Sequence, residues 1–253
     1  MSTPAVAPQS QRVPQLLGQT VVVIGGSAGI GLETARQARA EGAKLVLAGR
    51  NAERLQNAAK ELEAESTRAF DAVDAVALEQ FFRDLPTPID HVMVTAGRPF
   101  YGRLMDMDFA EARYTLESHL VLAIQVARHT VHKMRPGGTL IFIGGTGARR
   151  PGLGLGITSA LTAAFPALIA NLAIETAPVR VNLIAARFDD TPLSAELLGD
   201  DLEKRRQQLR DTNPIRRVVT AGDVAALAVH IMTNTALTGA TYDIDGGQQL
   251  VAR

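Results

Sequence analysis

A glycine-rich loop, Gly25-Gly26-Ser27-Ala28-Gly29-Ile30-Gly31, lies between an apolar run at 20–24 and a helical stretch. Its spacing suits a phosphate group, because Gly25 permits a sharp turn off a strand and Gly29 lets the backbone approach closely. Gly31 lets the following helix pack near the sheet, and the helix N-terminus presents unpaired N–H groups with a partial positive charge. The loop therefore predicts nucleotide binding; the alternative is a glycine-rich turn that holds no ligand.

Arg50 follows the second apolar run, at 44–48, and stands between Gly49 and Asn51. Sites for NAD in such folds place a carboxylate near this point, where it binds the ribose hydroxyls, and Gly49 has none. The guanidinium of Arg50 instead offers a fork of donors that fits a 2′-phosphate, a contact worth about 1.5–3 kcal/mol. We therefore expect NADP(H) rather than NAD as the cofactor; the alternative is a solvated surface arginine.

The elements that must position these residues appear as apolar runs alternating with helical stretches. Strands are predicted at 20–24, 44–48, 69–70, 91–95, 139–143, 180–185 and 241–244. Helices are predicted at 32–41, 52–64, 78–85, 109–134, 160–176, 199–210 and 223–233. Parallel strands need crossover helices, and strands that are apolar on both faces need cover on both sides. The pattern therefore predicts an α/β Rossmann fold: a doubly wound, mostly parallel sheet with helices on both faces and its site at the C-terminal strand ends.

The domain organisation follows from the same pass along the chain. No linker interrupts residues 17–253, so a single domain is expected there. Residues 1–16, rich in Pro and Gln, are expected to form a flexible N-terminal tail. Pro166 lies inside the helix predicted at 160–176, where it removes a hydrogen bond and clashes one turn back. That helix is expected either to kink or to have its first turn re-formed as loop.

Composition excludes several kinds of function. The 253 residues carry 26 Lys and Arg against 26 Asp and Glu, so bulk charge does not favour nucleic-acid binding. No Cys is present, which excludes thiol nucleophiles and Cys-ligated zinc, and His129 and His132 have no acidic partner at metal spacing. No signal or membrane segment is recognised, because the apolar runs are only strand-length. We therefore expect a cytoplasmic protein with a small-molecule substrate, and no metal, nucleic-acid or membrane partner.

Further motifs occur in an order typical of one family. They are DAVD at 71–74, TAG at 95–97, RVN at 180–182, Thr191-Pro192 and DGG at 245–247, besides GGSAGIG at 25–31. With these motifs the chain resembles the short-chain dehydrogenase/reductase family over residues 18–250. The resemblance implies a nicotinamide dinucleotide lying across the strand ends. It also implies a homodimer or homotetramer built from the helix at 109–134 and the one after it.

The positions that match the family's motifs are expected to contact the cofactor from its phosphates, through the adenine and its ribose, to the nicotinamide carboxamide. Together with the glycine loop and the residues after the second strand, the expected cofactor residues are Gly25, Ser27, Gly29, Ile30, Gly31, Arg50, Asn51, Asp71, Ala72, Ala96, Gly97 and Thr191.

The positions that carry the family's chemistry differ in this chain. The family uses a Tyr as proton donor or acceptor, a Lys one helical turn later, a Ser that orients the substrate oxygen and an Asn in the preceding helix. TSALTAA at 158–164 aligns with the family's YSASKAA, which places Thr158 at the Tyr and Thr162 at the Lys. Gly145 stands at the Ser position and His119 at the Asn position. No Tyr of the chain has a Lys four or seven residues later, and no Lys occurs from 134 to 203.

These departures favour cofactor binding over the family's ordinary catalysis. Loss of general acid–base help lowers a rate by about 10²–10⁴-fold, whereas holding cofactor and substrate together still contributes ~7–11 kcal/mol. We expect an oxidoreductase with a non-standard active site that acts on a small carbonyl- or alcohol-type substrate. The alternative is an inactive dinucleotide-binding protein with a sensing or structural role. The candidates for proton transfer are His119, Thr146 and Thr158; a polar residue facing the cleft and a turn hydroxyl are the plainer interpretations of His119 and Thr146.

Overall fold

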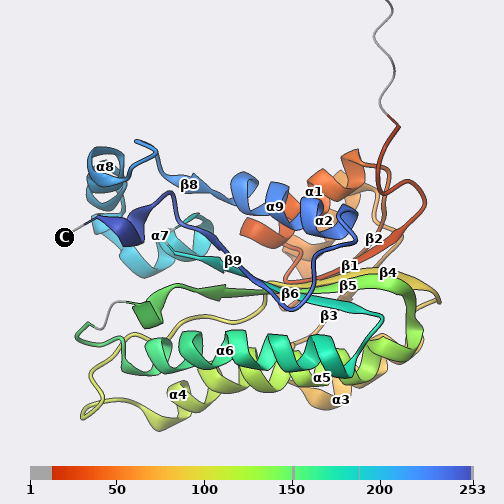
Figure 1. The fold of residues 1–253 in the computed structure, drawn as a ribbon, viewed down its shortest axis with the longest axis horizontal. Coiled ribbons are helices and arrows are strands. Elements are labelled where there is room, and N and C mark those ends of the chain that lie inside the picture. The colour runs from red at the N-terminus through yellow and green to blue at the C-terminus, as the bar shows by residue number, and fades with distance from the viewer. Residues whose placement is uncertain (1–12, 150–151, 188, 252–253) are drawn as a thin grey trace, which may run out of the picture.

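A parallel sheet forms the centre of the computed structural model, which describes residues 13–149, 152–187 and 189–251 (Figure 1). Its strand order in the described chain is β3(Ser66–Ala69), β2(Lys44–Gly49), β1(Thr20–Ile24), β4(Ile89–Val94), β5(Met134–Gly145), β6(Arg180–Ala186) and β9(Thr241–Ile244). Every neighbouring pair in this sheet is parallel. The predicted doubly wound fold with a parallel sheet is therefore confirmed. Residues 1–12 of the expected tail, and Arg150 and Pro151, lie outside the described residues.

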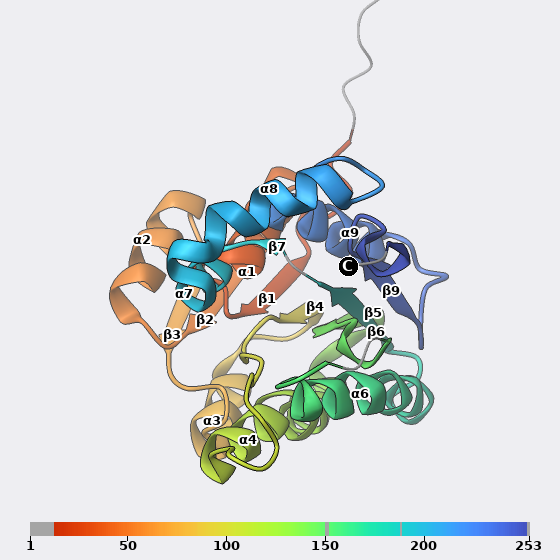
Figure 2. The ribbon, with the colours of Figure 1, turned by 90° about the vertical axis from the view of Figure 1, so that its left-hand side faces the viewer.

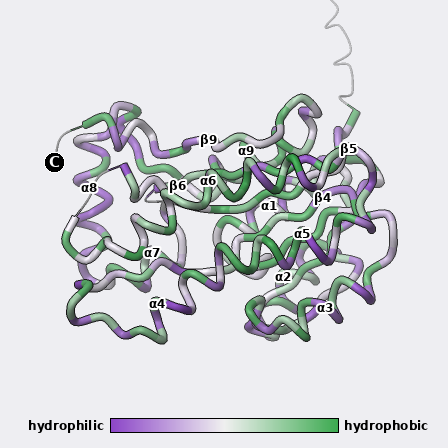
Figure 3. The backbone as a smooth tube through the Cα atoms, turned by 60° about the horizontal axis from the view of Figure 1, so that its bottom comes forward, coloured by the Kyte–Doolittle hydropathy of each residue, from purple (hydrophilic) through white to green (hydrophobic). Residues whose placement is uncertain are grey.

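Helices cover both faces of the sheet, as Figures 1 and 2 show. One face carries α1(Gly29–Ala40), α2(Ala52–Leu62) and α9(Ala221–Thr233), and the other carries α3(Ala75–Asp84), α4(Phe109–Leu116), α5(Leu122–Thr130) and α6(Gly156–Glu175). Two short strands, β7(Asp189–Asp190) and β8(Val219–Thr220), pair with each other and connect to α7(Pro192–Leu198) and α8(Leu202–Thr212). In Figure 3 the tube of α8 is largely hydrophilic, in contrast to the apolar strands of the centre.

Two apolar cores lie on the two faces, because the inner strands are buried on both sides. Phe82, Phe142 and Phe165 are in the core under α3, α5 and α6. Leu45, with other strand residues, packs under α1, α2 and α9. Leu16 belongs to the second core and is fully buried, and its backbone N–H donates to the carbonyl of Glu41. The packed structure therefore includes a residue that the sequence analysis assigned to the tail.

The strand order reverses between β1 and β4, which are neighbours in the sheet although β2 and β3 lie between them in sequence. In open α/β sheets a ligand binds outside the carboxyl ends of the strands at such a reversal. Here the loops at 25–28 and 95–97 leave β1 and β4 side by side at this point. The fold therefore places the glycine-rich loop and the TAG segment together.

The helix predicted at 109–134 is interrupted in a way that the sequence pattern did not indicate. Between α4 and α5 the chain forms a wider π-helical segment, Glu117–Val121, in which the N–H of Leu122 bonds to the carbonyl of Glu117. The helical stretch ends in a 3₁₀ turn at Val131–Lys133, and β5 begins at once. Such π segments widen the helix and re-aim its side chains, and this one contains His119.

Other boundaries also differ from the prediction. Helix α6 begins at Gly156, four residues early, and continues through Pro166 as one helix, so the looped first turn is wrong. The third strand occupies Ser66–Ala69 rather than 69–70, and the charged helix predicted at 199–210 is a 3₁₀ turn followed by α8. Helix α9 begins at Ala221, where Thr220 and Asp223 form a capping box.

One helix of the described residues, α6, is long and apolar enough by length and composition to cross a membrane. The expectation that apolar segments are only strand-length is therefore wrong for this stretch. Helix α6 packs on β5 and β6, with Leu161, Phe165, Ile169 and Leu172 buried in the core. The core helix of a soluble protein passes the same length and composition test.

Candidate cofactor and substrate site

The loop between β1 and α1 has the backbone of an anion cradle. Gly25 has φ +94° and Gly29 has φ +54°, in the left-handed region that favours glycine. A Cβ on Gly31 would lie 2.3 Å from the carbonyl oxygen of Gly25 and 2.7 Å from Oγ1 of Thr95, so that position accepts no larger residue without movement. Ala28 precedes α1 without a side-chain cap, which leaves the first N–H groups of the helix for a ligand.

The TAG segment after β4 is fastened directly to this cradle. The N–H of Thr95 donates to the carbonyl of Ile24 at 2.8 Å, and its hydroxyl donates to Ile24 at 3.2 Å and to Gly25 at 3.3 Å. Thr191, the N-cap of α7, lies over the other end of the loop, since a Cβ on Gly29 would be 3.6 Å from that of Thr191. The structure thus brings the expected residues from three distant segments to one place.

The end of β2 lies beside the same loop, because a Cβ on Gly49 would stand 3.1 Å from Oγ of Ser27. Arg50, the next residue, is exposed. The side chain of Asn51 has a structural role that the sequence analysis did not assign: its oxygen accepts the N–H of Arg54 at 2.8 Å and caps α2. Arg50 therefore follows a strand end that borders the glycine loop, in the short connection between β2 and α2.

Asp71, expected beside the adenine, has a neighbour that the sequence analysis missed. The hydroxyl of Tyr114, on α4, lies 3.4 and 3.5 Å from the two carboxylate oxygens of Asp71. Burial, followed by the charge of Asp71, raises the pKa of Tyr114, while the charge and hydrogen bond of Arg50 act in the opposite direction. Asp71 is half-buried and Ala72 is buried. No local signal marks Tyr114, because 43 residues separate it from Asp71.

His119 faces the TAG segment from the π-helical turn. A Cβ on Gly97, whose φ is +118°, would lie 2.8 Å from Cε1 and 3.0 Å from Nε2 of His119. Nδ1 donates to the carbonyl of Thr115 at 2.8 Å, and the ring stands edge-on to Phe165 with centroids 6.3 Å apart. Burial lowers the pKa of His119, so the ring is neutral at pH 7, and Nε2 has no hydrogen bond to any described residue.

Unlike Nε2 of His119, the hydroxyls of Thr158 and Thr162, at the expected catalytic positions, are hydrogen-bonded to the backbone. The hydroxyl of Thr158 donates to the carbonyl of Phe100 at 2.6 Å, and that of Thr162 donates to the carbonyl of Thr158 at 2.9 Å. Thr146 is buried, and its hydroxyl has no hydrogen-bond partner in the described chain. A Cβ on Gly147 would lie 3.3 Å from Oγ1 of Thr162, so these residues border one another. Thr158 and Thr162 therefore use their only hydrogens on backbone carbonyls.

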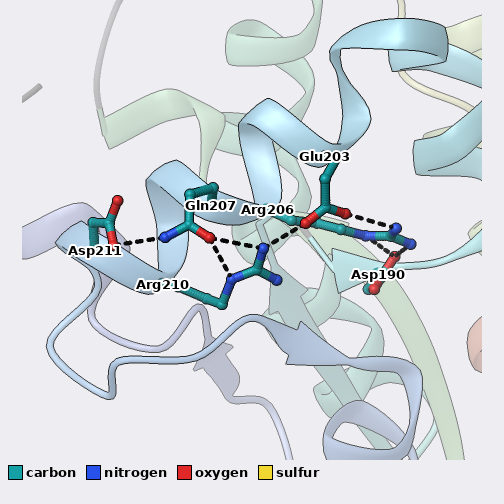
Figure 4. A network of polar contacts seen from close by, with 6 residues as sticks. All are labelled: Asp190, Glu203, Arg206, Gln207, Arg210 and Asp211. Carbon is teal, nitrogen blue, oxygen red and sulfur yellow. Dashed lines mark hydrogen bonds and ion pairs between the residues drawn. The ribbon is translucent and has the colours of Figure 1, made fainter.

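A network of ion pairs holds α8 against β7 (Figure 4). Arg206 donates to Asp190 at 2.6 Å and contacts Glu203, which also accepts from Arg210. Asp190 and Arg206 are both half-buried. The helix is therefore docked, and is not simply a solvated charged helix.

Arg149 pairs with Asp243, its Nη2 lying 2.6 Å from Oδ1, and its Nη1 also contacts Gln249. Within the described residues no three His, Asp or Glu side chains are placed to hold a metal ion.

Comparisons with known proteins agree with this geometry. A sequence profile described as "Enoyl-(Acyl carrier protein) reductase" matches residues 25–249. The chain is 26% identical to "Short-chain dehydrogenase/reductase ATR9" of Stachybotrys chlorohalonatus, over 93% of this chain and 98% of that protein. Among solved structures, a small-chain dehydrogenase in complex with NADPH has a TM-score of 0.79 and 26% identity, covering 92% of this chain and 100% of the other.

A second solved structure, L-sorbose reductase from Gluconobacter frateurii complexed with NADPH and L-sorbose, has a TM-score of 0.84 and 26% identity. It covers 95% of this chain and 100% of the other. A glycine cradle at the reversal of a parallel sheet defines the dinucleotide-binding class of α/β proteins. Because the family profile spans most of the chain, the protein belongs to the short-chain dehydrogenase/reductase family.

Proposed function

We propose that this chain is an NADP(H)-dependent oxidoreductase with a non-standard active site, acting on a small carbonyl- or alcohol-type substrate. The observation that carries the proposal is the cradle formed by Gly25, Gly31 and Thr95, in which a single added methyl group would overlap backbone. Two structural relatives that contain NADPH each share 26% identity with this chain over nearly its whole length. One of them also contains a sugar substrate, L-sorbose.

In this proposal the residues of the cradle hold the dinucleotide in order along the strand ends. Ser27, Gly29, Ile30 and Gly31 bind its phosphates through backbone N–H groups and the N-terminus of α1. Gly25, whose own N–H donates to the carbonyl of Ala48, shapes the turn that brings them there. The adenosine lies among the residues after β2, β3 and β4, which are Arg50, Asn51, Asp71, Ala72, Ala96 and Gly97. Thr191 lies at the nicotinamide end. The bound dinucleotide supplies hydride transfer, and every proton must be handled by the chain or by water.

His119 is the proposed proton acceptor in the direction of alcohol oxidation. Its Nδ1–H is fixed on the carbonyl of Thr115, so the lone pair of the neutral ring lies on Nε2, at the edge that faces Gly97. In that reaction the substrate carbon loses a hydride and its hydroxyl loses a proton, which Nε2 takes. Thr158 is a weaker candidate, because its hydrogen is already donated to Phe100. Thr146 keeps a buried hydroxyl that can orient a substrate oxygen.

The test is a turnover screen with purified protein and NADPH. Ketones, aldehydes, enones and imines are offered in turn, and loss of NADPH absorbance is followed together with product formation. We expect reduction of at least one carbonyl class. The alternative is a dinucleotide sensor, which would bind NADPH but would not oxidise it with any of these substrates. That result would refute the proposed catalysis and leave the proposed NADPH binding intact.

A homodimer or homotetramer is also proposed. Val121 at the end of the π-helical segment, Ile124 on α5 and Ile174 on α6 are large apolar side chains that are exposed in the single chain. Such residues on neighbouring helices suit a contact between copies of the chain. Light scattering on the eluting protein should give a multiple of the chain mass of 26.9 kDa, and Ile124→Glu should lower it. A monomer in the unmutated protein would refute this part.

A further inference from the structure

Tyr114 reaches the adenosine end of the site from a helix that contributes no motif. It lies on α4, 43 residues after Asp71 in the sequence. Its hydroxyl is 3.4 and 3.5 Å from the two carboxylate oxygens of Asp71. Oδ1 of Asp71 also accepts the N–H of Val73 at 3.2 Å, which fixes the carboxylate. The tyrosine therefore approaches a carboxylate that is already held in place.

Arg50 lies beside the segment that contains Asp71, because Gly49 pairs with Ala69 and its carbonyl accepts the N–H of Phe70 at 3.1 Å. From there it acts on the hydroxyl of Tyr114. Its charge and a hydrogen bond to the hydroxyl oxygen lower the pKa of Tyr114, but burial and Asp71 raise it by more, so the hydroxyl stays protonated at neutral pH. A phenol can then donate to the carboxylate and accept from the guanidinium at the same time. The described ion pairs do not include a direct pair between Arg50 and Asp71.

We propose that Tyr114 is a specificity-determining residue for the 2′-phosphate of NADP(H), because its hydroxyl interacts with both Arg50 and Asp71 and thereby keeps the guanidinium free to bind that phosphate. This inference rests on the proposed NADP(H) function. Without the hydroxyl, Arg50 would close on Asp71, because opposite charges attract and no group would then separate them. A 2′-phosphate would then have to break that ion pair before it could bind, whereas NADH, which lacks the phosphate, would not.

The test compares the dissociation constants of NADPH and NADH by calorimetric titration of the full chain and of Tyr114→Phe. The phenylalanine keeps the ring and its packing and removes only the hydroxyl. We expect NADPH to bind about fivefold more weakly, an effect of the size of one hydrogen bond, while NADH changes by less than about twofold. Tyr242→Phe, on β9 at the opposite edge of the sheet, is the matched control and should change neither.

Double-variant cycles separate positioning from packing. In an Arg50→Ala background, Tyr114→Phe should no longer change the ratio of the two dissociation constants, and Asp71→Asn should suppress the effect in the same way. Equal losses for NADPH and NADH in Tyr114→Phe would overturn the inference, because they would show that the tyrosine only packs against the adenosine. An unchanged ratio in Tyr114→Phe would also overturn it. Failure of the unmutated chain to bind NADPH would instead refute the proposed function itself.

Discussion

The loops after β1, β2 and β4 differ from the segments around α6 in what fixes their shape. In the first region, glycines at left-handed φ values and close backbone contacts shape the loop, and Thr95 ties two of the loops together. In the second, Thr158 and Thr162, which the family resemblance aligns with its proton-transfer residues, both donate to backbone carbonyls. The comparison indicates that backbone conformation shapes the first region, whereas in the second the side-chain hydroxyls are already bonded within the chain.

The largest expected effect concerns the region around α6 and its neighbour His119. His119→Gln should lower kcat/KM for alcohol oxidation by about 10²-fold or more, since a general base contributes about 10²–10⁴-fold. In the unmutated chain kcat/KM should rise with pH through the lowered pKa of His119, because only the neutral ring accepts a proton. It should level off at a lower pH than an ordinary histidine, with a pKa of about 6.5, would give. His132→Gln, on an exposed residue, is the control. A pH profile identical in the two variants would remove His119 from the mechanism.

The next effect tests the cradle. Gly31→Ala should weaken NADPH binding by about 100-fold. The new Cβ would lie 2.3 Å from the carbonyl oxygen of Gly25, so the loop must shift, and such overpacking costs about 1–3 kcal/mol or more. Gly222→Ala is the matched control, since the nearest atom to its Cβ is 3.6 Å away. Titration calorimetry measures the affinities, and thermal unfolding shows whether the variant is folded. Unchanged NADPH affinity in Gly31→Ala would contradict the proposal that this loop binds the cofactor.

Arg50→Ala should weaken NADPH binding tenfold or more and leave NADH nearly unchanged, because one arginine–phosphate contact is worth about 1.5–3 kcal/mol. Arg54→Ala, an exposed arginine in the first turn of α2, provides the comparison. The two affinities are measured side by side at fixed ionic strength. If both cofactors lost affinity equally, the assignment of Arg50 to the 2′-phosphate would be wrong.

The smallest effect is expected at the two threonines. Thr158→Val with Thr162→Val should change turnover of any substrate found by less than about threefold, since both hydroxyls donate to backbone carbonyls and have no hydrogen left for substrate. Steady-state kinetics of the double variant provide the measurement. A loss of about 100-fold or more, the size of a lost general acid, would show that one of them replaces the family's tyrosine.

The sequence predicted the parts of the site that depend on local pattern. The glycine loop, the strand before it and the helix after it are one contiguous segment, so their order was sufficient. The contact of Tyr114 with Asp71 was not predictable, because it joins segments 43 residues apart and depends on how α4 packs. The π-helical turn that directs His119 toward Gly97 also leaves no pattern in a stretch that is helical throughout. Burial of Leu16 was missed because a single apolar residue after a polar tail carries no periodicity.

The hydrogen-bond partners of Thr158 and Thr162 could not be predicted from the sequence either. Alignment placed Thr158 and Thr162 at the catalytic positions, but only the structure shows that Phe100 accepts from the first and that the carbonyl of Thr158 accepts from the second. The same holds for Asn51, whose side chain caps α2. Local residue types therefore predicted which segments gather at the strand ends, while the partner of each polar atom depended on the packing of distant segments.

The central claim is that the adenosine end of this site selects the phosphorylated dinucleotide. Calorimetric titration of the unmutated chain with NADPH and then with NADH tests it most directly. We expect about one NADPH bound per chain, with an affinity at least tenfold above that of NADH, the size of one arginine–phosphate contact. Absence of NADPH binding, or tighter binding of NADH, would contradict the claim.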